Sequence, residues 1–184
     1  MRRYYFALAQ AGLFIFLIIS YAIVPAFAQG SGGISNYGTD PRTVVPFTIA
    51  FVLAAVFTYL AAQSIPSNNI FQKKFRLLLK LLAFIYLALL ISTYPYQLTP
   101  QLDLIHKFIG LSLLALQAYI CIFVSRNFKK EIVIYTFLGL FILGSVIIFL
   151  SLFTPLGWLA VGQVLGSTGF AGVGLRVFGL MRGV

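Results

Sequence analysis

Six long apolar stretches, separated by short polar segments, follow one another along the 184-residue chain. Each is close to the roughly 20 residues that an α-helix needs to cross the hydrocarbon of a bilayer. The apolar residues are continuous rather than alternating, which favours helices over the strands of a membrane β-barrel. The pattern predicts an all-α, polytopic membrane protein. Its single domain (1–184) would be a six-helix transmembrane bundle, with spans at about Tyr4–Ala28, Val44–Gln63, Phe75–Thr93, Leu104–Val124, Ile132–Phe153 and Trp158–Met181.

The basic residues predict how these spans are oriented. Cytoplasmic segments of membrane proteins carry an excess of Lys and Arg. With a cytoplasmic N-terminus, the outer side keeps only Arg42 and Lys107. The inner side then holds Arg2, Arg3, Lys73, Lys74, Arg76, Lys80, Arg126, Lys129, Lys130, Arg176 and Arg182. We therefore expect a multi-pass protein of the cell membrane with both termini cytoplasmic, in which Lys80 and Arg176 extend along their helices to the headgroups.

The first span also has features of a cleavable signal peptide. Arg2 and Arg3 precede the apolar run, and Ala26-Phe27-Ala28 fits a signal-peptidase site. Cleavage there would leave five helices. The apolar run is longer than the 7–15 residues or so of a signal-peptide core, which favours an uncleaved helix.

Composition narrows the classes of function. Hydrophobic residues make up 61% of the chain and charged residues 9%, too few for a soluble domain. The basic residues that give the net charge of +10 lie between apolar runs instead of on one exposed face, so we expect no nucleic-acid partner. A single cysteine, Cys121, excludes an internal disulfide, and a single histidine, His106, excludes histidine-rich metal sites. We expect no metal and no cofactor.

Polar and small residues share one face of the fourth span. They lie within roughly 60° of arc on a helix, and polar groups are costly against lipid, so this stripe should face the bundle interior. One interpretation is an outward-opening pocket lined by Asp103 and His106. The other is that Asp103 caps the helix while His106 hydrogen-bonds a neighbouring loop. The stripe comprises Asp103, His106, Gly110, Gln117 and Cys121.

Glycines recur along the sixth span and predict close helix packing. Their spacings of 4, 3 and 3 place them on one face, and the first two form a G-x-x-x-G motif. The groove either packs within the bundle or binds a membrane partner protein, and Gln163 would lie near its outer end. The glycines are Gly162, Gly166, Gly169 and Gly172.

The segment between the first two spans is predicted to form a structured lid over the outer end of the bundle. Asp40 would cap the second helix with Pro41 at its first position, and Arg42 would pair with Asp103 or a lipid phosphate. Together with the polar residues of the fourth and sixth spans, the candidate ligand-binding residues are Ser35, Asn36, Asp40, Arg42, Asp103, His106, Gln117 and Gln163.

The run Ile34-Ser35-Asn36-Tyr37-Gly38-Thr39 resembles the "ISDxGT" segment that follows the first helix of the damage-regulated autophagy modulator family. That family consists of six-helix membrane proteins with prokaryotic relatives of unknown function, and it often has a histidine where His106 stands. Asn36 replaces the usual aspartate, and Ser167-Thr168-Gly169 stands where the family often has a Glu-Trp pair. The resemblance implies a role connected with membrane lipids.

Three classes of function remain to be weighed. The chain contains the residue types of a Ser-His-Asp triad, namely Ser35, His106 and either Asp103 or Asp40. No nucleophile-elbow pattern supports catalysis, however. The size and helix count also resemble the substrate-binding component of energy-coupling-factor vitamin transporters, where Ala7 and Ala11 would serve to dock a partner. We favour a non-enzymatic membrane protein that binds lipid, a small ligand or a partner at an outer-face polar pocket, with membrane lipids as its main partners.

Overall fold

A computed structural model of the chain describes residues 2–25, 33–95, 97–153 and 158–181. Within these ranges there is no strand, so the prediction of an all-α protein is confirmed. The elements are α1 (Arg2–Ile23), the short 3-10 helix η2 (Gly33–Gly38), α2 (Val44–Gln63), α3 (Ile70–Thr93), α4 (Pro100–Asn127), α5 (Ile132–Phe153) and α6 (Leu159–Leu180).

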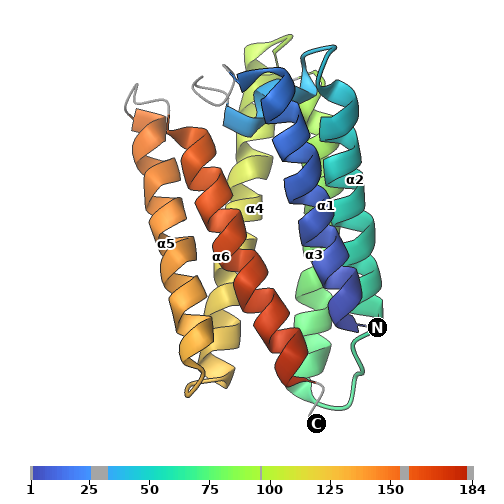
Figure 1. Cartoon of the computed structure of the whole chain (residues 1–184), viewed down its shortest axis with the longest axis vertical. Helices are drawn as coiled ribbons and strands as arrows, with labels where there is room; N and C mark the ends of the chain where they lie inside the picture. The colour runs from blue at the N-terminus through green and yellow to red at the C-terminus, as the bar shows by residue number, and fades with distance from the viewer. Residues whose placement is uncertain (1, 26–32, 96, 154–157, 182–184) are drawn as a thin grey trace.

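Consecutive helices run in opposite directions, so α1 starts and α6 finishes at the same end of the bundle (Figure 1). This terminal end also carries the α2–α3 and α4–α5 connections. η2 lies at the opposite end, which we call the lid end (Figure 1). The fold therefore brings η2 to the ends of helices that are distant in sequence.

Helix boundaries agree with the sequence prediction for α2 and α5 and differ for α1, α3 and α4. α1 stops at Ile23, shortly before Pro25, and the suggested cleavage site at Ala26–Ala28 lies outside the described residues. α3 and α4 begin several residues before their predicted starts, because polar side chains cap them. Asn69 Oδ1 accepts a hydrogen bond from Gln72 N at 2.8 Å, and Thr99 Oγ1 accepts one from Leu102 N at 3.2 Å.

Among the described residues, five helices, α1 to α5, are long and apolar enough to cross a membrane. α6 falls short of that criterion, and its glycines, Gln163 and Arg176 account for its lower apolarity. Several long apolar helices side by side indicate a membrane-embedded protein.

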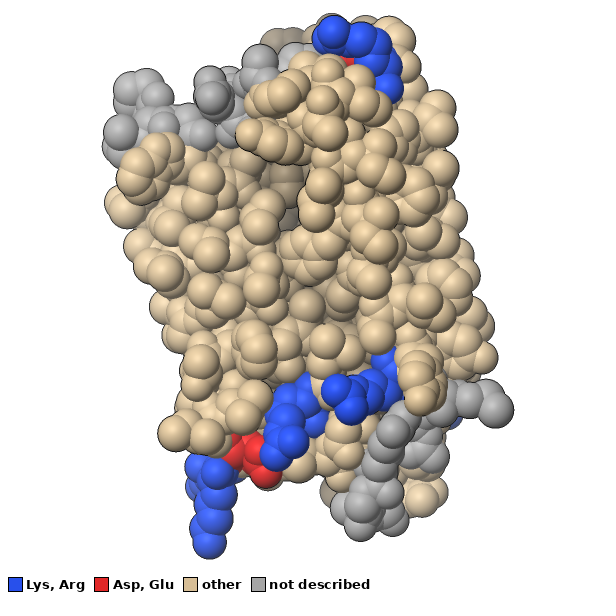
Figure 2. Space-filling view, in the orientation of Figure 1, with Lys and Arg blue, Asp and Glu red and all other residues tan. Residues whose placement is uncertain are grey.

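On the face shown in Figure 2, Lys and Arg side chains gather at the terminal end, and a smaller group lies at the lid end. At the terminal end Lys80 lies over the ring of Tyr59, with Nζ 5.7 Å from its centroid. Arg176 reaches the same end but pairs with a protein carboxylate: its Nε and Nη2 donate to Glu131 Oε2 at 2.9 and 2.7 Å. The carboxylate that pairs with Arg176 thus belongs to the protein itself.

The glycines of α6 pack within the chain, as the first of the two sequence interpretations proposed. A Cβ on Gly162 would lie 2.8 Å from the backbone nitrogen of Ile148, and one on Gly169 would meet the backbone nitrogen of Phe141. Gly172 lies against the ring of Phe137 in the same way. The two backbones therefore approach closely along most of their length, and α5 packs mainly against α6.

The two ends of the bundle are packed differently. Toward the terminal end, Phe6, Phe75 and Phe178 form a closed aromatic cluster, with ring centroids 5.3 Å apart for Phe6–Phe178 and 5.8 Å apart for Phe75–Phe178. All three side chains are fully or almost fully buried. The space between the helices is thus filled here, and it opens toward the lid end.

Candidate functional site

A cavity of about 560 Å³ lies between α1, α3, α4 and α6, with η2 at its lid end. Its volume is within the range of small-molecule sites in proteins, about 300–1,000 Å³. The surface is hollowed in the half of the molecule nearer the lid end (Figure 2). Leucines form much of the wall: Leu13, Leu17, Leu89, Leu111, Leu113, Leu114 and Leu159.

The lid η2 is tied to the bundle by side chains from separate helices. Gln163 Oε1 of α6 accepts from Ile34 N at 3.0 Å, and Thr43 Oγ1 donates to Tyr37 O at 2.8 Å. Gly33 has a φ of +55°, and a Cβ there would lie 2.7 Å from Gln163 Oε1, so glycine is required at this position. η2 is therefore a structured cover, in agreement with the sequence prediction.

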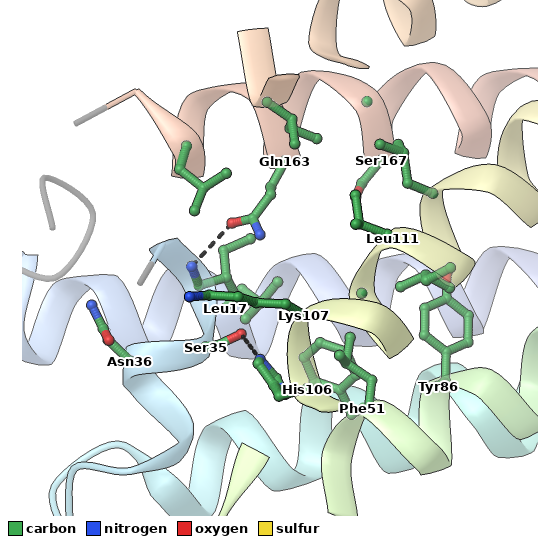
Figure 3. A pocket seen from close by; sticks show the side chains of 18 of the residues that line it. Leu17, Ser35, Asn36, Phe51, Tyr86, His106, Lys107, Leu111, Gln163 and Ser167 are labelled. Atoms are coloured by element: carbon green, nitrogen blue, oxygen red, sulfur yellow. Dashed lines mark hydrogen bonds between the residues drawn. The ribbon is translucent and has the colours of Figure 1, made fainter. Parts of the chain in front are cut away.

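His106 lies at the junction of lid and bundle, with 7% of its surface exposed. Its Nε2 is 2.8 Å from Ser35 Oγ of η2, and its Nδ1 is 3.0 Å from Ser92 Oγ of α3 (Figure 3 shows the first contact). Ser92 Oγ also donates to the carbonyl oxygen of Leu89 at 2.9 Å. The imidazole of His106 thus links η2, α3 and α4. It hydrogen-bonds the lid, as one of the two sequence interpretations predicted.

Charged residues flank the cavity near His106. Lys107 Nζ donates to Asp103 Oδ2 at 2.6 Å, and both residues line the cavity together with Asn36 and Gln97. Asp103 lies in the first turn of α4, where the positive end of the helix dipole favours a carboxylate. The prediction that Asp103 caps this helix was wrong, because the cap is Thr99, four residues earlier.

In the lid segment, the expected Arg42–Asp103 pair and the expected Asp40 cap of α2 were both wrong. Arg42 pairs with Asp40, not with Asp103: Nη2 is 2.8 Å from Asp40 Oδ2, and Nε donates to Oδ1 at 3.0 Å. Asp40 does not cap α2 either, because its Oδ1 also accepts the backbone amide of Arg42 and α2 begins only at Val44. These hydrogen bonds from Arg42 lower the pKa of the Asp40 carboxyl. Neither residue lines the cavity.

The inner part of the cavity has a second polar contact. Gln117 Nε2 donates to the hydroxyl of Tyr86 at 3.2 Å, and both side chains are buried. The predicted stripe on α4 faces inward as expected, since His106, Gln117 and Cys121 are all buried. Gly110 lines the cavity, whereas Cys121 lies deeper in the core.

The polar residues of the site that were missed from the sequence are Ser92, Tyr86, Gln97, Lys107 and Ser167. Ser92 and Tyr86 are polar residues inside the apolar run of α3, and a polar residue in a membrane span is itself a signal of function or buried pairing. Lys107 follows Asp103 at the i,i+4 spacing of helical ion pairs. Ser167 lies one turn beyond Gln163.

The described residues contain no group of three or more His, Cys, Asp and Glu side chains that could hold a metal ion. What the site offers instead is a mainly apolar chamber with hydroxyl, imidazole, amide and ammonium groups near its lid. Such a chamber suits an amphiphilic molecule. No protein-family model, curated protein or solved structure matches this chain.

Proposed function

We propose that the protein binds a membrane lipid or a related small amphiphile in the cavity beneath η2. The observation that carries the proposal is the arrangement of the lining: polar groups of Ser35, His106, Lys107 and Gln163 lie near the lid, and leucines form much of the remaining wall. An amphiphile bound with its head at the lid would place its chain against the leucines, where apolar burial stabilises it. The resemblance of residues 34–39 to the autophagy-modulator segment is a second support for a lipid-related ligand.

In this proposal all six helices span the cell membrane and both termini are cytoplasmic. The gathering of Lys and Arg at the terminal end supports that orientation (Figure 2). The cavity and η2 then belong to the outer leaflet, and α1 and α6 border a hollow through which an amphiphile can reach the cavity from the side.

Cysteine labelling tests the orientation. In a chain with Cys121 replaced by alanine, the single cysteine variants Pro41→Cys and Asn127→Cys place a thiol at exposed positions of opposite ends. A membrane-impermeant maleimide added to intact cells is expected to label Pro41→Cys and to leave Asn127→Cys unlabelled until the cells are lysed. The reverse order of labelling would contradict the orientation.

Filling the cavity tests the binding. A Cβ on Gly166 would meet nothing within 4 Å, and Gly166 lines the cavity, so Gly166→Leu places an isobutyl group in the cavity without forcing α5 and α6 apart. We expect the amphiphile retained by the purified protein in native mass spectrometry to fall at least about 10-fold, the effect of some 1.4 kcal/mol in binding.

The matched control is Gly139→Leu, which also has open space around its Cβ but lies on the exposed surface of α5. It should retain the wild-type amount of ligand. Equal retention by Gly166→Leu and Gly139→Leu would show that no ligand occupies the cavity.

A substrate-binding transport component is the second candidate. Ala11 is exposed and Ala7 half-buried on α1, so small residues do lie on the outside of the bundle, where a partner helix could pack. The same mass spectra separate the candidates, because a water-soluble vitamin in the cavity would favour transport and a lipid would favour the first proposal.

A further inference from the structure

We propose that Ser35 is an acyl-accepting nucleophile, activated by His106, and that the cavity's ligands include acyl esters. The inference rests on the proposed function, because the ester must first occupy the cavity. It adds a covalent step to binding. The elements that build it are far apart in sequence: Ser35 lies in η2, His106 in α4 and Ser92 in α3.

The hydrogen bonds around His106 define its tautomer. Ser92 has one hydroxyl proton, which it donates to Leu89 O at 2.9 Å. Ser92 Oγ can then only accept from the imidazole, so Nδ1 carries the ring proton and donates across 3.0 Å. Nε2 is left as the acceptor, and the Ser35 hydroxyl donates to it across 2.8 Å. This is the hydrogen-bond direction that a general base needs to remove a proton from a serine.

Ser92 holds the place that a carboxylate occupies in a Ser-His-Asp triad. Neither carboxylate expected from the sequence serves there: Asp103 pairs with Lys107 at 2.6 Å and Asp40 with Arg42 at 2.8 Å. A hydroxyl fixes the tautomer and the ring plane but stabilises an imidazolium less than a carboxylate does. Ser92 is therefore a positioning residue, and the reaction it supports should be slow.

Donors for the developing oxyanion also line the cavity. The amide oxygen of Gln163 accepts from Ile34 N, which leaves its NH2 group on the cavity side (Figure 3). Lys107 lines the same cavity with its ammonium group paired to Asp103 at 2.6 Å, so the Gln163 amide is the donor on which the site relies. Hydrogen-bond donors near the site of attack stabilise the negative charge that develops on a carbonyl oxygen.

The step balances without any redox partner. Ser35 Oγ attacks the ester carbonyl carbon as its proton passes to His106 Nε2. The bond from the carbonyl carbon to the alkoxy oxygen then breaks, and the leaving alcohol takes that proton. The product is an acyl ester on Ser35, which a water molecule or the hydroxyl of a second amphiphile removes by the same route in reverse.

The test is acylation of the full-length protein in nanodiscs by p-nitrophenyl octanoate. We expect intact-mass spectra to show one added octanoyl group, with peptide mapping placing it on Ser35. Ser35→Ala should abolish the adduct, and His106→Gln should slow its formation at least about 100-fold. Ser92→Ala should slow it, and Ser92→Thr, which restores the hydroxyl, should recover most of the rate.

A control serine tests whether the labelling is specific. Ser112 is half-buried on α4 outside the cavity lining, and its hydroxyl donates to Phe108 O. Ser112→Ala should keep the adduct. An adduct that survives Ser35→Ala, or a wild-type protein that stays unmodified, would overturn the inference.

Binding of octyl glycerol ether, which has no acyl group, separates this failure from failure of the proposed function. Retention of the ether by an unreactive wild-type protein would leave the binding proposal standing and remove the nucleophile. A wild-type protein that neither forms the octanoyl adduct nor retains the ether would contradict both the nucleophile and the binding proposal. A circular dichroism spectrum of Ser35→Ala that matches the wild-type spectrum would show that the variant is folded.

Discussion

Gly169→Leu is expected to separate α5 from α6 and to lower the thermal unfolding midpoint by roughly 10 °C. A Cβ at this position would meet the backbone nitrogen of Phe141, and a backbone, unlike a flexible side chain, cannot move aside alone. Overpacking of this kind costs typically 1–3 kcal/mol, and we expect about 3 kcal/mol because a leucine adds three more carbons. A fluorescence-detected thermal melt in detergent measures the change.

The control for this prediction is again Gly139→Leu, on the other helix of the pair, where an added side chain meets open space. Its unfolding midpoint should stay within a few degrees of the wild-type value. A Gly169→Leu protein as stable as this control would show that the two helices do not pack through that glycine.

Gly33→Val is expected to release η2 from the bundle and to expose the Ile34 amide to solvent. Position 33 has a φ of +55°, which a β-branched residue rarely adopts, at a cost of about 1–3 kcal/mol. The added side chain would also displace Gln163 Oε1, which accepts from Ile34 N. Hydrogen exchange in residues 33–38 should become at least about 10-fold faster.

The same variant should leave the helices intact, because none of the contacts between α1 and α2 or between α5 and α6 involves Gly33. Its far-ultraviolet circular dichroism is therefore expected to match the wild-type spectrum. Unchanged exchange in residues 33–38 would mean that the Gln163 hydrogen bond does not hold the lid.

The helices could be predicted from the sequence because apolarity is a local property that each span shows by itself. Starts of α3 and α4 were misplaced for a local reason too. Asn69 and Thr99 cap these helices inside polar segments, so the helices extend beyond their apolar runs by a turn or more. Side-chain caps at the polar ends are a better guide to these boundaries than the onset of apolarity.

The site could be predicted only in part. The sequence placed Ser35, His106 and Gln163 near one another, since topology alone brings their helices to the same end. It did not show which groups pair. Arg42 bonds a carboxylate two residues away instead of one across the bundle, because the turn at residues 40–43 brings the two side chains together without ordering any other segment.

Ser92 illustrates a different limit. Its hydroxyl bonds a carbonyl of its own helix, as serines in membrane helices commonly do, and nothing in the linear sequence marks it as the partner of His106. The sequence expectation of a non-enzymatic protein relied in part on the lack of a nucleophile-elbow motif. The nucleophile and base proposed above come from η2 and α4, and a pair of that origin would carry no such motif.

The glycine-mediated pairing of α5 and α6 bears on biogenesis. α6 falls short of the apolarity that marks a membrane span, and in the proposed arrangement it must still pass from the translocon into the bilayer. Its glycines pack against α5, a helix rich in large aliphatic and aromatic residues whose Gly144 lies against the α6 backbone. Close packing of α6 on α5 would therefore favour insertion of the two as one helical hairpin. A ribosome that stalls before α6 is complete would leave α5 in lipid with its groove partner missing, a ready substrate for membrane quality-control proteases.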